Sequence, residues 1–175
     1  MIPKFDSNGN LPAGFIAPEL EEFEERFVHH FHDSTTRREI FNGYIRYNGK
    51  LDAIKVATLQ WVNGSYTTSK VNPEDIDFVT HIDAIELDRS GEIKEPFAKL
   101  TDKSRAKSEC RCDVYFIAVY PPENPELYES TKEDIEYWSK WFAHDRENNP
   151  KGIIEFNLSD GSFNIEKYYG GMIDG

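Results

Sequence analysis

The sequence contains few cysteines, no long apolar run and a minority of basic residues. No stretch of its 175 residues approaches the ~20 apolar residues of a membrane-spanning helix, and the first residues do not resemble a signal peptide. Lys and Arg number 20 against 32 Asp and Glu, for a net charge of −12. An acidic protein has no general affinity for nucleic acid or anionic membranes, because both bind basic surfaces. We therefore expect no membrane association and a cytoplasmic location.

The scarcity of cysteine also limits the possible cross-links and metal sites. Cys110 and Cys112 are the two cysteines, and so close a pair is poorly placed for an unstrained disulfide. Zinc would require further ligands at suitable spacing, which neither these cysteines nor the "HHFH" segment at 29–32 has nearby. We expect two reduced thiols packed in the core of a cytoplasmic protein.

Aromatic residues are plentiful, at 14% of a chain that is 38% apolar. This content is too high for a disordered chain and is enough to build one core. The residue pattern predicts a single α/β domain over 1–175, with residues 1–17 as an extended arm rich in turn residues. Short β-branched and aromatic runs predict strands. The predicted strands are 56–62, 75–82, 112–120 and 153–158.

Apolar residues at helical spacing predict three main helices between these strands. The first begins at Pro18 and places Phe23 and Phe27 on one face. The second follows Thr36, which with Glu39 matches a capping box. The third starts near Ser130, which forms a similar pair with Glu133. A polar segment, 83–109, is expected to contain a turn and then a short helix, with a short strand between them left open.

Two aspartates one residue apart stand at the start of the second predicted strand. In a strand Asp75 and Asp77 would project from the same face, about 6.6 Å apart. Neighbouring carboxylates resist ionisation unless they share a cation. Mg²⁺, or Mn²⁺ in its place, prefers oxygen ligands and commonly binds together with phosphates. Asp113, at the start of an otherwise apolar strand, is the candidate third acid of a two-metal arrangement.

The strand before these acids ends in a turn suited to a phosphate. Gly64 permits close approach of a ligand to the backbone, and Ser65 offers a hydroxyl and an amide. Lys70 and the pair Arg37 and Arg38 are candidate phosphate contacts; the two arginines are otherwise solvated. The alternative is that Asp75 only caps a turn and that Asp77 is only exposed at a sheet edge.

Taken together, these residues resemble the signature of the nucleotidyltransferase fold of the DNA polymerase beta superfamily. The match consists of Gly64-Ser65, nine intervening residues, Asp75-Ile76-Asp77 and the later Asp113, with Asn63 as a mild departure. Four segments are also similar to blocks of a bacterial domain-of-unknown-function family with this fold. They are "GNLPAG" at 9–14, "RREI" at 37–40, "GSYTTSKVNPEDID" at 64–77 and "WFAHDRENNPKGIIEFNL" at 141–158.

The resemblance implies a minimal nucleotidyltransferase-like fold, with a mixed sheet flanked by helices, that uses Mg²⁺ or Mn²⁺ and a nucleoside triphosphate (NTP). The residues that would hold the metal and take part in catalysis are Asp75, Asp77 and Asp113, and those that would bind the nucleotide are Gly64, Ser65 and Lys70. The implied activity is transfer of a nucleoside monophosphate from an NTP to an unidentified acceptor, whether protein, RNA or small molecule.

Two other functions remain open on the sequence. One is a catalytically inactive binding module with this fold, such as an antitoxin-like or defence-system partner protein, which would tolerate loss of Asp75 and Asp77. The other is a metal-dependent phosphohydrolase, which would release free nucleotide. An RNA acceptor would require the basic residues of 99–107 to gather with Arg37 and Arg38; a solvated helix face is the simpler interpretation of that segment.

Overall fold

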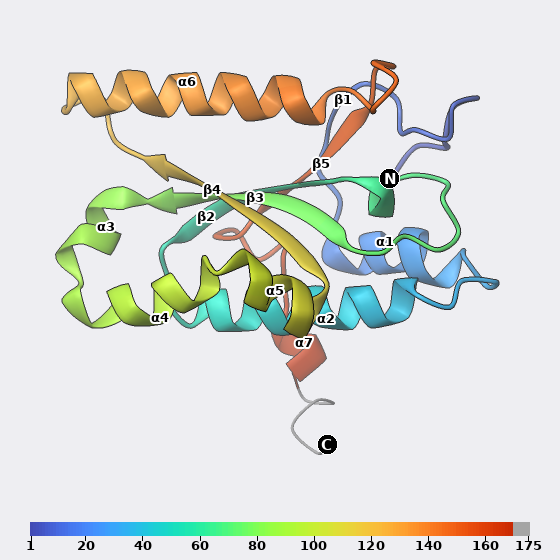
Figure 1. The fold of residues 1–175 in the computed structure, drawn as a ribbon, viewed down its shortest axis with the longest axis horizontal. Helices are drawn as coiled ribbons and strands as arrows, with labels where there is room; N and C mark the ends of the chain where they lie inside the picture. The colour runs from blue at the N-terminus through green and yellow to red at the C-terminus, as the bar shows by residue number, and fades with distance from the viewer. Residues whose placement is uncertain (170–175) are drawn as a thin grey trace.

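The centre of the computed structural model, which describes residues 1–169, is a five-stranded mixed sheet (Figure 1). Its strands lie in the order β1-β5-β2-β3-β4. β1 is parallel to β5, β2 is antiparallel to both β5 and β3, and β4 is parallel to β3. The strands are β1 (Gly14–Ile16), β2 (Ala57–Asn63), β3 (Ile76–Asp83), β4 (Cys112–Val119) and β5 (Gly152–Asn157).

Helices cover both faces of this sheet. α6 alone covers one face, whereas α1, α2, α4 and α5 lie on the other (Figure 1). A π-helical turn, Glu25–His29, continues α1. The helices are α1 (Leu20–Glu24), α2 (Arg37–Asp52), α3 (Ala84–Arg89), α4 (Lys94–Leu100), α5 (Lys103–Cys110), α6 (Pro125–Phe142) and α7 (Glu166–Tyr169). This arrangement confirms the predicted mixed α/β fold class.

Side-chain alternation along the strands produces two apolar layers. The larger layer is packed by α1 and α2 and includes Phe23, Phe27, Phe41, Phe78 and Phe156. The smaller layer lies under α6 and includes Trp61, Val79, Ile117, Phe142 and Ile153. Because Val79 and Ile117 face α6, Asp77 and Asp113, an even number of residues earlier, face the same side of the sheet.

The predicted arm, 1–17, is more tightly incorporated than its turn-rich sequence indicates. β1 forms within it and pairs with β5 at the sheet edge. Ile2 and Leu11 are buried in the larger apolar layer. The arm is therefore a part of the core and the sheet, because a partner strand distant in sequence supplies its hydrogen bonds.

Both predicted capping boxes are wrong. The Oγ1 atom of Thr36 is buried without a hydrogen-bond partner, and Ser34 instead accepts a hydrogen bond from the Arg37 amide at 3.1 Å. α6 begins at Pro125, so Ser130 lies inside the helix. Proline is well tolerated in a first helical turn, where its missing N–H has no intrahelical partner to lose.

The sequence expectation for the two cysteines is met. Cys110 and Cys112 are both free and buried. None of the helices within residues 1–169 is long and apolar enough to cross a bilayer.

Candidate functional site

The predicted acids Asp77 and Asp113 are direct neighbours in the sheet. Asp77 in β3 pairs in register with Asp113 in β4 on one side and with Asn63 in β2 on the other. Asp75 lies immediately before β3 and its Oδ2 atom is 2.9 Å from the Lys107 ammonium of α5. The three carboxylates therefore lie where the end of β2, the starts of β3 and β4, and α5 come together.

The glycine of the preceding turn packs directly on the Asp77 carboxylate. Gly64 has φ of 74° and ψ of −165°, a backbone conformation that only glycine adopts readily. A Cβ atom built on Gly64 would lie 1.7 Å from Oδ2 of Asp77. The predicted turn and the predicted acid are therefore in direct contact. Only glycine fits at position 64, because any side chain there would overlap the Asp77 carboxylate.

Ser65 and Lys70 lie in the segment that follows this turn. Ser65 begins a short 3-10 turn and is half-buried. Its carbonyl accepts a hydrogen bond from Oγ1 of Thr68 at 2.8 Å. The Lys70 residue is exposed. Both remain predicted nucleotide contacts.

The environment of Asp77 disfavours its charged form. Burial, followed by the neighbouring carboxylates of Asp75 and Asp113, raises the pKa of Asp77 to about 6, although Lys151 and Lys107 oppose the shift. Three acids at one place are costly to a fold unless a cation is shared among them. Such perturbed carboxylates are typical of functional sites.

Lys151 is a site residue that the sequence analysis missed. It is only 4% exposed, and its Nζ atom donates a hydrogen bond to the Gly64 carbonyl at 2.5 Å. Burial lowers the pKa of Lys151 to about 8, while Asp77 and Asp145 oppose the shift. The only sequence signal is a lysine one glycine before the largely apolar run "IIEFNL", since a charge entering a buried strand requires a partner.

Asn63, the apparent departure from the superfamily motif, joins separate parts of the site. Its Nδ2 atom donates to the carbonyls of Phe142 at 3.0 Å and Gly152 at 3.1 Å, and its Oδ1 atom accepts from the Gly64 amide at 2.8 Å. The end of α6, the start of β5 and the Gly64 turn are therefore held by one buried side chain.

Tyr115 and Lys103 extend the site along β4 and α5. The Tyr115 hydroxyl donates to Oδ2 of Asp113 at 3.2 Å. The Lys103 ammonium lies 3.6 Å from the centre of the Tyr115 ring, and the Trp138 ring of α6 packs on the same tyrosine. Asp113 thus has a defined hydrogen-bond donor, which the spacing of the sequence did not reveal.

The structure does not support the suggested phosphate role of Arg37 and Arg38. Arg37 is fully buried and donates to backbone carbonyls of the segment 66–70, so it is a structural residue. Arg38 is exposed but forms an ion pair with Glu24. The basic residues of 99–107 are likewise engaged, with Lys99 on Glu95 and Arg105 on Glu109. A freely available basic surface for RNA is not formed by these residues.

Loops from distant parts of the sequence meet beside the Gly64 turn. The Ser69 amide donates to the Gly9 carbonyl at 2.9 Å. Nδ2 of Asn10 donates to Oδ2 of Asp145 at 2.8 Å. With the contacts of Arg37 and Lys151, these bonds join all four segments that carried the family resemblance.

The three carboxylates have the oxygen ligands that a hard divalent cation prefers, but they are not arranged as a complete metal site. Carboxylate oxygens are the ligands that Mg²⁺ and Mn²⁺ prefer, and Asp77 lies in register with Asp113. Within residues 1–169 no three His, Cys, Asp or Glu side chains already stand together as a metal site. Asp75 is paired with Lys107 instead. The carboxylates have the chemistry that such a cation prefers, and Asp75 would become available to it when this ammonium moves away.

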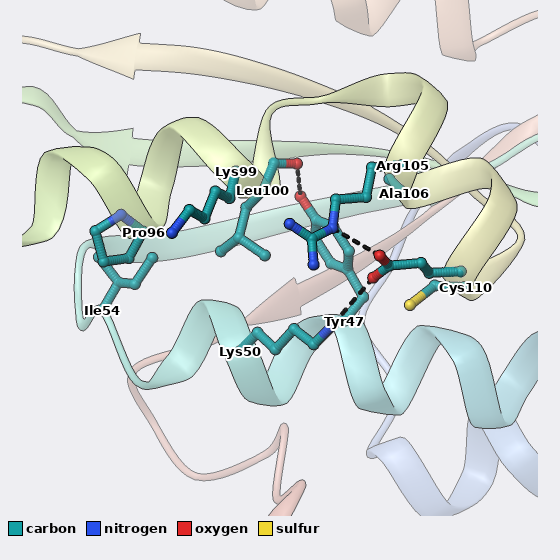
Figure 2. A pocket seen from close by; sticks show the side chains of 10 residues that line it. Tyr47, Lys50, Ile54, Pro96, Lys99, Leu100, Arg105, Ala106 and Cys110 are labelled. Atoms are coloured by element: carbon teal, nitrogen blue, oxygen red, sulfur yellow. Dashed lines mark hydrogen bonds and ion pairs between the residues drawn. The ribbon is translucent and has the colours of Figure 1, made fainter.

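A separate pocket of about 250 Å³ opens between α2 and the segment α4–α5 (Figure 2). Glu109 forms ion pairs there with Lys50 at 3.3 Å and Arg105 at 2.7 Å, and Tyr47 donates to the Leu100 carbonyl. Lys99 also lines the pocket and pairs with Glu95, which lies outside the lining. None of the predicted site residues lines the pocket. We do not assign it a role in the chemistry of the carboxylates.

Replacing Asp77 with asparagine is expected to stabilise the protein at neutral pH. Because its pKa rises from 3.8 to about 6 on folding, the folded protein binds this proton more tightly than the unfolded chain. Wild-type stability therefore falls as pH rises from about 4 to about 6, by up to about 3 kcal/mol. We expect Asp77→Asn to be more stable by about 1–3 kcal/mol at pH 7.5 and equal near pH 4, measured by urea unfolding.

Asp145→Asn provides a control of opposite sign. Hydrogen bonds from Asn149 and Asn10 lower the pKa of Asp145, so its charged form stabilises the fold above its ordinary pKa and is lost as pH falls. This variant should be destabilised at pH 7.5. A difference between Asp77→Asn and wild type that does not change with pH would contradict the assigned electrostatics.

Comparison with known proteins places the chain in one family. No curated protein and no solved structure matches it. A family model matches residues 3–157, which include every segment of the site just described. The protein therefore belongs to DUF6932, a family of unknown function.

Proposed function

We propose that this protein is a metal-dependent nucleotidyltransferase, which transfers a nucleoside monophosphate from an NTP to an acceptor. One observation carries the proposal: the glycine of the Gly64-Ser65 turn packs on Asp77 without room for a Cβ atom, while Asp77 pairs in register with Asp113. The turn proposed to hold the phosphates therefore lies beside the carboxylates proposed to hold the cation.

One group of residues would bind the metal, and another would bind the nucleotide. Asp75, Asp77 and Asp113 would hold one or two Mg²⁺ ions, which when bound neutralise the phosphate charge and polarise the reacting oxygens. The amide and hydroxyl of Ser65 would hold the triphosphate beside Gly64. Most of the catalysis would come from positioning and charge stabilisation.

The proposed step is a substitution at the α-phosphorus. A hydroxyl oxygen of the acceptor forms a bond to the α-phosphorus, and the bond between this phosphorus and the bridging α–β oxygen breaks. Pyrophosphate leaves with the electron pair of that bond, and the acceptor proton passes to the Asp113 carboxylate. The Tyr115 hydroxyl, which donates to Asp113 at 3.2 Å, would hold that carboxylate in place.

The electrostatic cost of the buried acids favours a working enzyme over an inactive relative. Burying Asp77 beside two other acids lowers stability at neutral pH, as its raised pKa indicates. A binding module would gain nothing from acids that lower its stability, and we would expect it to have lost one of them. All three carboxylates and the Gly64 turn are present together.

Binding of Mg²⁺ and ATP or GTP, measured by calorimetry, tests the proposal. Wild type should bind a nucleotide only with Mg²⁺ present, and the double variant Asp75→Asn with Asp77→Asn should lose that binding. A second double variant, Asp88→Asn with Asp134→Asn, removes two exposed acids and should bind like wild type. Absence of binding by folded wild-type protein would overturn the proposal and favour the partner-binding module.

ATP labelled at the α-phosphate then distinguishes the remaining activities. A nucleotidyltransferase leaves the label on an acceptor, whereas a phosphohydrolase releases it as free nucleotide. An inactive module does neither and would instead copurify with a partner protein. Candidate acceptors are proteins, RNA and small molecules, tested in that order with cell extract as the source.

A further inference from the structure

α5 presents two lysines, one helical turn apart, to the carboxylate site. Lys103 and Lys107 are four residues apart, and side chains at this spacing share one helix face. Lys107 contacts Asp75 at 2.9 Å, and Lys103 lies on the ring of Tyr115, which in turn binds Asp113. Lys107 therefore contacts a proposed metal ligand. Lys103 contacts the tyrosine that holds the proposed proton acceptor.

Lys107 is the more exposed member of its ion pair. Its side chain is 60% exposed, whereas that of Asp75 is 19% exposed. The helix does not depend on this contact, because Ala106 and Cys110 are buried in the core and the following Arg111 donates to the Glu74 carbonyl at 2.9 Å. The ammonium can leave Asp75 while α5 stays in place.

Three other cations near the site already have partners in the protein. Arg37 is buried among backbone carbonyls, and Arg38 is paired with Glu24. Lys151 is buried and donates to the Gly64 carbonyl. Besides the exposed Lys70, a polyphosphate that arrives beside Gly64 would therefore find its side-chain cations on α5.

We propose that Lys107 is an exchangeable counter-cation: it neutralises Asp75 in the metal-free protein, yields to a divalent cation, and then binds the polyphosphate of the nucleotide. The last step rests on the proposed function. The exchange replaces one positive charge by another at Asp75, so the acids are not left uncompensated between turnovers. Metal binding thereby releases the side chain that the nucleotide requires.

The exchange predicts effects of opposite sign in the variant Lys107→Gln. Binding of Mn²⁺ alone, measured by electron paramagnetic resonance, should become about two- to fivefold tighter, because the metal no longer displaces an ammonium. Binding of ATP at saturating Mn²⁺ should become about tenfold weaker, because a charge-assisted phosphate contact is lost. A residue that only supports the fold would weaken both.

Lys99→Gln is the matched control, because Lys99 is also an exposed helical lysine paired with an acid, Glu95. It should change neither affinity. Mn²⁺ binding that is unchanged or weaker in Lys107→Gln, or absent from wild type, would overturn the exchange. Tighter Mn²⁺ binding with unchanged ATP binding would overturn the phosphate role. If no variant binds ATP while Lys107→Gln still binds Mn²⁺ more tightly, the nucleotidyltransferase proposal fails and the competition at Asp75 stands.

Discussion

Replacing Arg37 with methionine is expected to destabilise the protein by about 3–5 kcal/mol. The guanidinium is fully buried and donates hydrogen bonds to the carbonyls of Phe27, Tyr66, Thr68 and Lys70. Methionine fills much of the same volume but leaves these oxygens without a donor, and an unsatisfied buried acceptor costs about 1–3 kcal/mol. The segment between β2 and β3 would lose its main internal support.

Arg38→Met is the matched control for this measurement. Arg38 is the adjacent residue and is exposed in an ion pair with Glu24, and such surface pairs contribute about 0–1 kcal/mol. Urea unfolding of both variants separates the two roles. Equal, small losses of unfolding free energy would show that the buried hydrogen bonds of Arg37 contribute little.

The second large effect is expected for Gly64→Ala. The new Cβ atom would lie 1.7 Å from Oδ2 of Asp77, and alanine would have to adopt the glycine conformation with φ of 74°. Backbone strain and overlap each cost about 1–3 kcal/mol, so we expect a loss of about 3–5 kcal/mol in unfolding free energy. Because relief of the overlap requires Asp77 to move, nucleotide binding should be lost as well.

Two other glycines separate the causes of this loss. Gly161 has φ of 82°, and no atom lies within 4 Å of the position that a Cβ atom would take there, so Gly161→Ala carries the backbone strain alone, about 1–2 kcal/mol. Gly91 has neither a positive φ nor a close neighbour, and Gly91→Ala should stay within about 0.5 kcal/mol of wild type. If Gly64→Ala resembles Gly161→Ala and still binds nucleotide, the close contact with Asp77 is not required.

The strands and the core were predictable from the sequence because their signals are local. Four of the five strands match the predicted ranges to within one or two residues. Each of these strands is a short run rich in β-branched and aromatic residues, and this composition favours strands. Asp77 and Asp113 were recognisable for the same reason, since an acid inside an apolar strand requires a partner.

The site's supporting residues were not predictable, because their roles depend on contacts between distant segments. Lys151 is 87 residues from Gly64 in the sequence, and its contact exists only because β5 lies beside β2. Arg37 looked like a solvated residue, since its sequence neighbours are polar. Its burial arises from the folding of segment 66–70 over the start of α2.

The sequence by itself determined the fold class and most of the sheet and predicted three acids as candidate site residues, because periodicity and the cost of burying charge act on each segment separately. The tertiary structure decided which groups surround those acids. It placed Asp113 in register with Asp77, Lys107 on Asp75 and Gly64 on the Asp77 carboxylate. Strand order and register set these contacts, and both are properties of the whole chain.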